Sequence, residues 1–148
     1  MPLKLTRIQY KQLNAKQKEN YNYQKLSAVL ADYGFVTMKL SSDWKGADLI
    51  AQHIDGDTLL IQLKARFTFC EKYIGKGLYI AFPYGSVWYL YPHDELLEKV
   101  DGLNRIKSTS AWTDSGVYSF ASLTQPLSQL LNSYQVEPSR QLKLKLSD

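Results

Sequence analysis

Hydrophobic positions along the first half of the chain follow two different periods. Within residues 12–33 they recur every three or four residues, which predicts one apolar face of a helix. The residues on this face are Tyr23, Leu26, Leu30 and Tyr33. Asn14 is a suitable N-cap for this helix and Gly34 a suitable stop. Three segments rich in strand-forming residues follow, which predict strands at residues 35–40, 47–54 and 58–65.

Three further strands and two helices are predicted in the second half of the chain. Residues 77–83 and 87–92 are dense in aromatic and aliphatic side chains, as strands are, and a turn at residues 84–86 joins them. The other predicted elements are a short helix at 94–100 capped by Asp94, an edge strand at 116–120 and a last amphipathic helix at 123–134 with Pro126 in its first turn.

This order of elements predicts an α/β or α+β fold in which a mixed central sheet is flanked by helices. A chain of 148 residues that is 45% hydrophobic has the size and composition of one globular domain. We therefore expect a single domain over residues 1–138. Residues 139–148 alternate Leu with Lys and are expected to form either an edge strand or a flexible tail.

Three polar residues interrupt the strands at 47–54 and 58–65, which the turn Asp55-Gly56-Asp57 joins into a hairpin. Asp48 lies near the start of the first strand, and Gln62 and Lys64 lie near the end of the second. Residues two apart in a strand share a face, so Gln62 and Lys64 are neighbours. Hairpin pairing brings Asp48 close to both, and the three side chains are predicted to converge.

Two interpretations of this cluster remain open from its chemistry alone. Asp48 and Lys64 can form an exposed ion pair, which contributes only about 0–1 kcal/mol and needs no function. Alternatively, Asp48 and the Gln62 side-chain oxygen bind a divalent metal. Lys64 then orients a water molecule or stabilises the charge that develops on a phosphate during hydrolysis.

Asp48 followed through a hairpin by Gln62-Leu63-Lys64 resembles the core motif of the PD-(D/E)XK nuclease superfamily, in a QxK variant. Compact bacterial intron-type homing endonucleases of this superfamily are similar. The resemblance covers roughly residues 12–92 and implies a restriction-endonuclease-like fold with a metal site at the open end of the hairpin. Two positions depart from the motif: Ala47 replaces its proline, and Gln62 replaces an acidic residue, which lowers the negative charge of the site.

Glu19 is the best candidate for a further carboxylate. Its spacing to Tyr23, Leu26 and Leu30 places it on the helical face that is predicted to pack on the sheet. In the superfamily that the chain resembles, a helix glutamate reaches the same metal from this direction. The alternative is that Glu19 stays in solvent near the helix start and interacts only with the helix dipole. Asp43 is a weaker rival because we expect it in the connection between strands.

The distribution of charge favours a polyanionic partner. The chain has a net charge of +4, and its first 40 residues carry seven Lys and Arg side chains, Lys16 and Lys18 among them, against two acidic ones. After the hairpin, residues 66–77 combine Arg66, Lys72 and Lys76 with aromatic residues and two glycines. We expect a mobile loop there, whose cations bind DNA phosphates. Phe67 and Phe69 are expected in the core instead.

Several other chemistries are disfavoured. His53 and His93 are not in a zinc-ligand spacing, Cys70 has no obvious base, and no nucleophile elbow or phosphate-binding glycine loop is present. One cysteine and no apolar leader or membrane segment predict a cytoplasmic protein, in the cytosol or nucleoid of a prokaryote, that is not bound to a membrane.

The sequence thus predicts an Mg²⁺-dependent DNA endonuclease in which Mn²⁺ can substitute. Asp48, Gln62 and Glu19 are the expected metal ligands, and Lys64 is the expected catalytic lysine. Cutting both strands of a duplex suggests a homodimer or higher oligomer. Homing, restriction, junction resolution and repair remain open as roles. The alternative, favoured by Gln62, is a nuclease-fold protein that binds nucleic acid or a protein partner without cutting.

Overall fold

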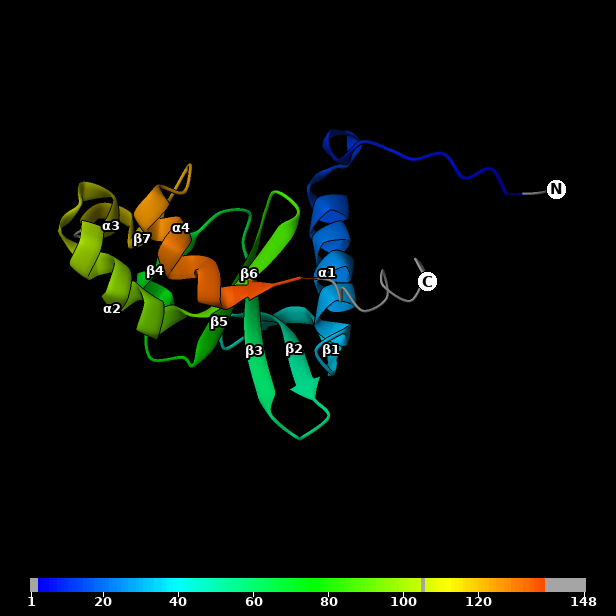
Figure 1. The fold of residues 1–148 in the computed structure, drawn as a ribbon, viewed down its shortest axis with the longest axis horizontal. Helices are drawn as coiled ribbons and strands as arrows, with labels where there is room; N and C mark the ends of the chain where they lie inside the picture. Colours follow the sequence, from blue (N-terminus) through cyan, green and yellow to red (C-terminus); the bar gives the residue numbers. More distant parts are fainter. Residues whose placement is uncertain (1–2, 105, 138–148) are drawn as a thin grey trace.

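A mixed sheet forms the centre of the molecule (Figure 1). The computed structural model describes residues 3–104 and 106–137, and within these ranges six strands make up this sheet. Their spatial order is β1 (Phe35–Trp44), β2 (Ala47–His53), β3 (Thr58–Leu63), β5 (Leu78–Tyr84), β6 (Val87–Pro92) and β8 (Gln135–Val136). β3 and β5 are parallel, and the other neighbours are antiparallel. The predicted mixed α/β fold is confirmed.

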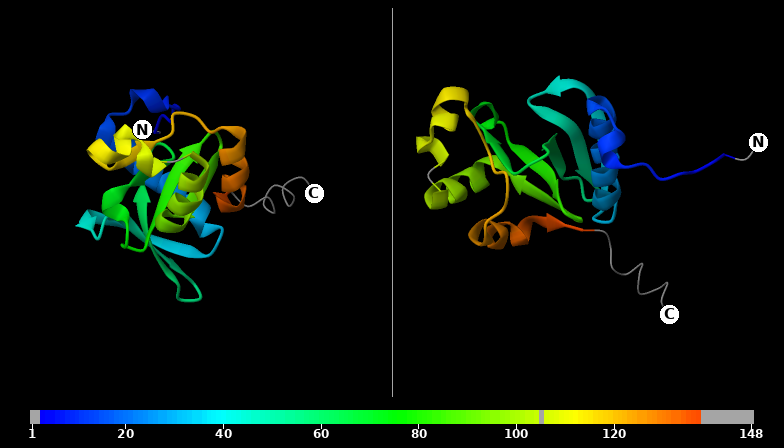
Figure 2. Two further views of the ribbon diagram at one scale, coloured as in Figure 1. Left: turned by 90° about the vertical axis from the view of Figure 1, so that its left-hand side faces the viewer. Right: turned by 90° about the horizontal axis from the view of Figure 1, so that it is seen from above.

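The long helix α1 (Ala15–Ala31) covers one face of the sheet (Figure 2). Asn14 caps it as predicted, because its side chain accepts a hydrogen bond from a main-chain N–H of the first turn. Leu26 and Leu30 are fully buried against Ile61 and other aliphatic residues of the strands. The spacing of apolar residues therefore predicted the helix and the inward position of Leu26 and Leu30, but Tyr33, expected on the same face, lies beyond the end of α1 and is exposed.

The opposite face carries the helices of the second half of the chain. These are α2 (His93–Asn104), α3 (Ser110–Ser115) and α4 (Gln125–Leu131). Their apolar side chains join an aromatic core that contains Phe67 and Phe69, both buried as predicted. The prediction that Asp94 caps α2 is wrong: the helix begins at His93, and the Asp94 carboxylate accepts a hydrogen bond from the Gly75 N–H instead.

A second, two-stranded sheet pairs β4 (Thr68–Cys70) with β7 (Val117–Ser119). The prediction of a mobile loop at residues 66–77 is therefore wrong for its first half, where all three residues of β4 are buried. The aromatic side chains of this segment enter the core, and β7 pairs with its main chain. The strand predicted at 116–120 exists, but it belongs to this small sheet and not to the edge of the large one.

Local structure differs from expectation at the ends of several elements. β1 continues to Trp44, so Asp43 lies within a strand and not in a connection. The predicted last helix is shorter, and a 3₁₀ turn follows it. The 3₁₀ turns are η1 (Tyr10–Gln12), η2 (Glu71–Tyr73), η3 (Ile106–Ser108) and η4 (Asn132–Tyr134). The tail predicted at 139–148 lies outside the described residues.

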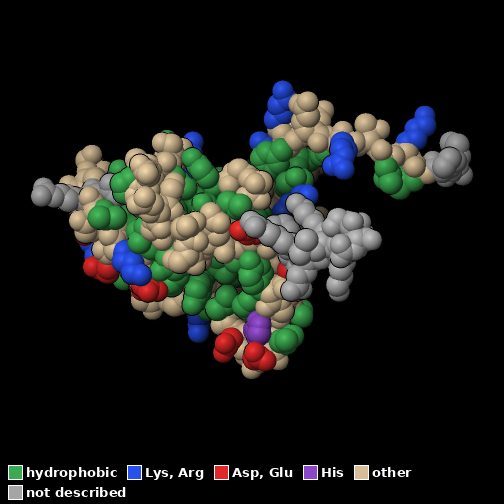
Figure 3. All heavy atoms as spheres, viewed as in Figure 1, with side chains coloured by type: hydrophobic (Ala, Val, Ile, Leu, Met, Phe, Trp, Pro, Cys, Tyr) green, Lys and Arg blue, Asp and Glu red, His purple; other side chains and the backbone are tan. Residues whose placement is uncertain are grey.

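Residues 3–9, here called the N-terminal arm, extend away from the start of α1 without helix or strand structure (Figures 1 and 2). Lys and Arg side chains follow one another along this arm in the space-filling view (Figure 3). Lys4 and Arg7 are both exposed. Part of the excess of positive charge in the first 40 residues therefore lies on the N-terminal arm, which extends away from the sheet and its helices.

Candidate active site

A tight turn between β1 and β2 positions Asp48. Lys45 and Gly46 form this turn with φ values of 55° and 86°, the left-handed pair that matches the twist of a two-residue hairpin. A Cβ at Gly46 would also lie 2.8 Å from a terminal side-chain carbon of Leu78, so that a larger residue here requires the Leu78 side chain to move. Ala47 is fully buried. Asp48 is therefore held at the second position of β2, with little freedom in its main chain.

The Asp48 carboxylate lies where β2 and β3 separate. The last paired residues at this end of the ladder are Leu49 and Ile61. Beyond them, the Leu63 N–H donates to Oδ2 of Asp48 at 2.9 Å, while Leu63 stays opposite Ala81 of β5. A side-chain oxygen thus takes the place of a main-chain acceptor, and the hairpin opens at the end where polar residues are gathered.

A pocket of about 390 Å³ lies at this opening. Glu19 from α1, Asp48 from β2, and Gln62 and Lys64 at the end of β3 all line it. All four predicted catalytic residues therefore share one pocket, although Glu19 is 45 residues from Lys64 in sequence. Asn22, one turn of helix after Glu19, also lines it; its spacing of three from Glu19 would have indicated this.

Glu19 differs from its predicted placement on the packed face of α1. Its side chain is 45% exposed and forms ion pairs with Lys16 at 3.8 Å and with Lys39 at 3.9 Å. The reason is that the buried residues of α1, from Leu26 to Leu30, all lie in its second half. The first half of α1 extends past the aliphatic core. In this half, the helical face that carries Glu19, and further along Leu26 and Leu30, therefore borders the pocket and solvent.

Lys64 is half-buried and directed by an aromatic ring. Its ammonium nitrogen lies 5.4 Å from the centre of the Tyr73 ring, in a cation–π contact, and Lys72 approaches the same ring at 5.4 Å. Tyr73 is only 4% exposed and belongs to the aromatic core. A rigid ring therefore restricts the positions that the Lys64 side chain adopts beside the pocket.

The other predicted DNA-binding residues are not among those that line this pocket. Arg66, Lys72 and Lys76 are exposed on the segment that follows β3, and none of them is among the residues that line the pocket. Lys18 is half-buried and contacts the ring of Tyr10 at 5.3 Å. Lys16, in contrast, borders an adjoining pocket together with Glu19. The structure thus separates the cations predicted to bind DNA into two groups.

The side chains that meet at the pocket offer oxygen donors. Two carboxylates, Asp48 and Glu19, and the amide of Gln62 are of the kind that Mg²⁺ and Mn²⁺ prefer. Among residues 3–104 and 106–137, no group of three or more His, Cys, Asp or Glu side chains is arranged to hold a metal ion. Mg²⁺ usually takes only one or two protein carboxylates and completes its shell with water and phosphate oxygens. The donors present therefore suit this ion.

A second polar cluster, around His93, was not anticipated. His93 is fully buried: its Nε2 accepts the Cys70 N–H at 3.0 Å, and its Nδ1 lies 2.8 Å from Oδ1 of Asp94. Burial lowers the pKa of His93 and outweighs the opposing effect of Asp94, so the neutral ring is favoured. Burial raises the pKa of Asp94. The hydrogen bonds from His93 and Gly75 are the largest of the effects that lower this pKa, and because the lowering effects together exceed that of burial, the net shift is downward.

Comparison of this chain with models of protein families, with curated proteins and with solved structures finds no match. None of the described helices is long and apolar enough to cross a membrane.

Proposed function

We propose that this protein is an Mg²⁺-dependent endonuclease that hydrolyses phosphodiester bonds in DNA, with Mn²⁺ able to replace Mg²⁺. The observation that supports it is the meeting of Glu19, Asp48, Gln62 and Lys64 around one pocket. These residues come from a helix, from β2 and from the end of β3, and their order is that of the superfamily motif that the sequence resembles, with Gln62 in place of its acidic residue. A structural ion pair alone requires neither Gln62 nor Glu19 at this place.

Asp48, Glu19 and Gln62 are the residues that would hold the metal. When bound, the ion supplies Lewis-acid stabilisation of the negative charge that develops on the phosphate. Asp48 has a second task, because its Oδ2 also fixes the end of β3 through the Leu63 N–H. Lys64, directed by Tyr73, contributes a positive charge and three N–H donors that orient the attacking water or stabilise the transition state.

The decisive test compares two aspartates of the same hairpin. Purified protein is incubated with supercoiled plasmid in Mg²⁺, in Mn²⁺ and in EDTA, and Asp48→Asn is compared with Asp57→Asn at the opposite, turn end of the hairpin. Asparagine at position 48 keeps an oxygen for the Leu63 N–H but loses the charge. We expect metal-dependent cleavage that Asp48→Asn abolishes and Asp57→Asn preserves. Cleavage that survives EDTA or Asp48→Asn would refute the mechanism.

Binding without cleavage is the second candidate function, and one observation favours it. Gln62 is neutral, and the pocket therefore contains two carboxylates and not three. If the protein binds plasmid or a partner protein but leaves every nucleic-acid substrate intact in both metals, this function replaces the first. Gln62→Glu then becomes informative, because a third carboxylate that restores cleavage identifies Gln62 as the cause of inactivity.

Duplex DNA and a second copy of the chain are the proposed partners. Two sites are needed to cut two strands, so we expect a homodimer or higher oligomer on DNA. The cations of the N-terminal arm and of the segment after β3 are exposed and are proposed to contact the DNA outside the pocket. Analytical ultracentrifugation with and without a DNA duplex measures the stoichiometry.

A further inference from the structure

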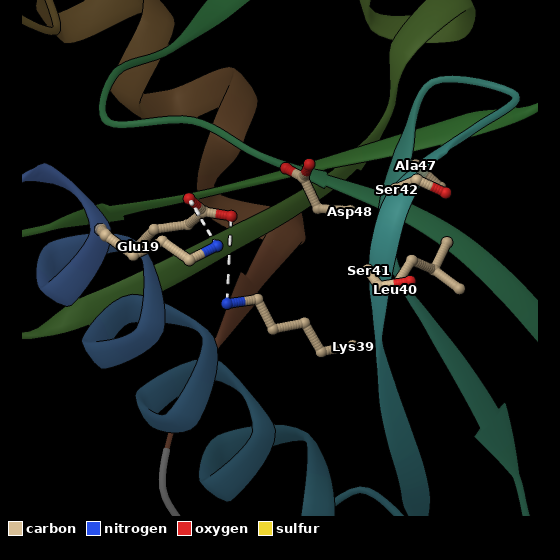
Figure 4. Close-up of a pocket in the computed structure, with 8 residues that line it drawn as sticks. Glu19, Lys39, Leu40, Ser41, Ser42, Ala47 and Asp48 are labelled. Carbon is tan, nitrogen blue, oxygen red and sulfur yellow. Dashed lines mark ion pairs between the residues drawn. The ribbon is translucent and has the colours of Figure 1, made fainter.

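A second pocket, of about 450 Å³, adjoins the first. Glu19 and Asp48 line both pockets, and Lys16, Lys39, Ser41 and Ser42 are added here. Figure 4 shows the side chains of Glu19 and Asp48 entering this space from α1 and β2, with Lys39 reaching into it from β1. The two pockets thus share their carboxylates but differ in their cations.

An irregularity in β1 places these residues. Lys39 is opposite Leu49 and Trp44 is opposite Ala47, so the register shifts between them and residues 40–43 bulge out of the ladder. A bulge bends a strand and redirects its side chains. As a result, both serines and Lys39 border a pocket that contains Asp48, the residue before Leu49 in β2.

Lys39 is held in place more firmly than an ordinary surface lysine. Its side chain is 25% exposed, and its ammonium donates to Oδ1 of Asn20. The same nitrogen lies 3.9 Å from Oε1 of Glu19 and 5.9 Å from the centre of the Tyr23 ring. Three neighbouring groups of α1 therefore fix the cation beside a carboxylate that we expect to bind metal.

Glu19 has two ammonium neighbours, Lys16 and Lys39, and their positive charge competes with that of a metal ion for the same carboxylate. Binding of a divalent ion by Glu19 weakens its attraction to both lysines, because the net charge beside them becomes positive. Their N–H groups are then available to an anion. Ser41 and Ser42 supply hydroxyl donors at the same pocket, and phosphate oxygens accept from Lys and Ser alike.

We propose that Lys39 exchanges partners: it pairs with Glu19 in the metal-free protein, and it binds a DNA phosphate next to the scissile one when Glu19 holds the metal. This rests on the proposed function, because it requires the metal site. Lys16, Ser41 and Ser42 complete the phosphate subsite. Metal and DNA then strengthen each other's binding, and linkage requires the two effects to be equal.

The test measures two affinities and does not depend on cleavage. Mn²⁺ binding to the DNA-free protein is measured by calorimetry, and binding of a labelled DNA duplex is measured by fluorescence anisotropy in Ca²⁺ and in EDTA. Lys39→Met removes the exchanging cation, and Lys39→Arg restores a positive charge. Lys25→Met is the matched control, because Lys25 is an exposed lysine of α1, the helix that Lys39 contacts, and it likewise lies over a tyrosine ring, that of Tyr21, at 5.3 Å.

For the wild-type protein, we expect Ca²⁺ to tighten DNA binding by about tenfold over EDTA, the size of a typical coupling. Lys39→Met should abolish most of this gain and tighten Mn²⁺ binding by about threefold, the effect of removing one competing ion pair. Lys39→Arg should recover the gain in part. Lys25→Met should weaken DNA binding equally in Ca²⁺ and EDTA and leave Mn²⁺ binding unchanged.

The outcomes separate this proposal from the function on which it rests. One outcome contradicts the partner exchange alone: Mn²⁺ binds the wild-type protein and not Asp48→Asn, but Lys39→Met behaves like Lys25→Met in both assays. The metal site is then supported, and the proposed role of Lys39 is wrong. If Mn²⁺ does not bind the wild-type protein at all, both proposals fall. Circular dichroism confirms that each variant is folded before its affinities are compared.

Discussion

Two aspartates of this fold accept a main-chain N–H at similar distances, yet their surroundings differ. Asp94 accepts from Gly75 at 2.9 Å and contacts the fully buried His93, so its hydrogen bonds connect α2 to the segment after β4. Asp48 accepts from Leu63 at 2.9 Å but borders an accessible pocket with three other oxygen-bearing side chains and an ammonium group. In the first region this hydrogen bond belongs to a network that connects α2 to the segment at and after β4, here called the bracing network (Cys70, Gly75, His93 and Asp94). In the second region it belongs to a proposed binding site.

This difference shows how to separate structural polar residues from candidate functional ones. Buried polar groups are stabilising when every donor and acceptor is paired within the protein, as around His93. Side chains of mixed charge that converge on a pocket are instead available to ligands. Substitutions in the first region should change stability, and those in the second should change activity.

The largest expected effect is on cleavage by Lys64→Met. Loss of the ammonium removes the proposed stabilisation of transition-state charge, and we expect the cleavage rate in Mg²⁺ to fall by about 100-fold or more. Lys99→Met, a change of the same kind on α2, should leave the rate within about twofold, because exposed ion pairs such as that with Glu95 contribute little. An undiminished rate for Lys64→Met would remove Lys64 from the mechanism.

The next effect is on stability and concerns the bracing network. His93→Ala leaves the buried Cys70 N–H without its acceptor, and we expect the free energy of unfolding to fall by about 2 kcal/mol. Asp48→Asn keeps its acceptor and should change stability by less than about 1 kcal/mol. Urea unfolding of both variants measures the difference. A larger loss for Asp48→Asn would show that the two regions do not differ in the way described.

The pH dependence of stability should carry the signature of His93. The pKa of His93 is lowered in the folded protein, chiefly by burial. As the pH falls through 6.5, the unfolded chain therefore binds a proton at this histidine while the folded chain does not. Stability is therefore full above 6.5 and declines as the pH drops below it, until the folded His93 is also protonated. The lowered pKa of Asp94 adds a separate loss in acid below 3.8.

His93→Gln isolates the first of these pH effects. The glutamine oxygen can still accept the Cys70 N–H, but the side chain does not titrate. Urea unfolding between about pH 5 and pH 7.5 should show a smaller slope for this variant than for the wild-type protein, since His53 is present in both. Equal slopes would mean that the buried histidine does not govern stability in this range.

The smallest effect per residue is expected for the exposed cations after β3. If Arg66, Lys72 and Lys76 each contact a phosphate, substitution of one by alanine should lower the slope of log affinity for DNA against log salt by about 1. Asp57→Asn is the control for a change of charge elsewhere and should not lower this slope. Unchanged slopes for all three variants would confine the DNA contacts to the pocket and the N-terminal arm.

Much of the local structure could be predicted from short-range patterns. The apolar spacing of Leu26 and Leu30, the cap at Asn14 and the alternation of Ile61 with Gln62 all depend on residues a few positions apart. Hairpin pairing likewise follows from adjacent strands, which is why Asp48, Gln62 and Lys64 were expected together. The burial of Phe69 was predicted, but the strand β4 was missed because its partner β7 lies far away in sequence.

The sequence by itself determined the order of the helices and strands other than β4, α3 and β8, the buried face in the second half of α1, and the hairpin that carries the polar residues. Only the tertiary structure decided that β3 pairs in parallel with β5, that Glu19 stands outside the aliphatic core, and that Lys39 meets it across the α1–β1 contact. The reason is physical. Periodicity reflects the geometry of one element, whereas register shifts, bulges and the position of a helix over a sheet depend on the packing of all elements at once.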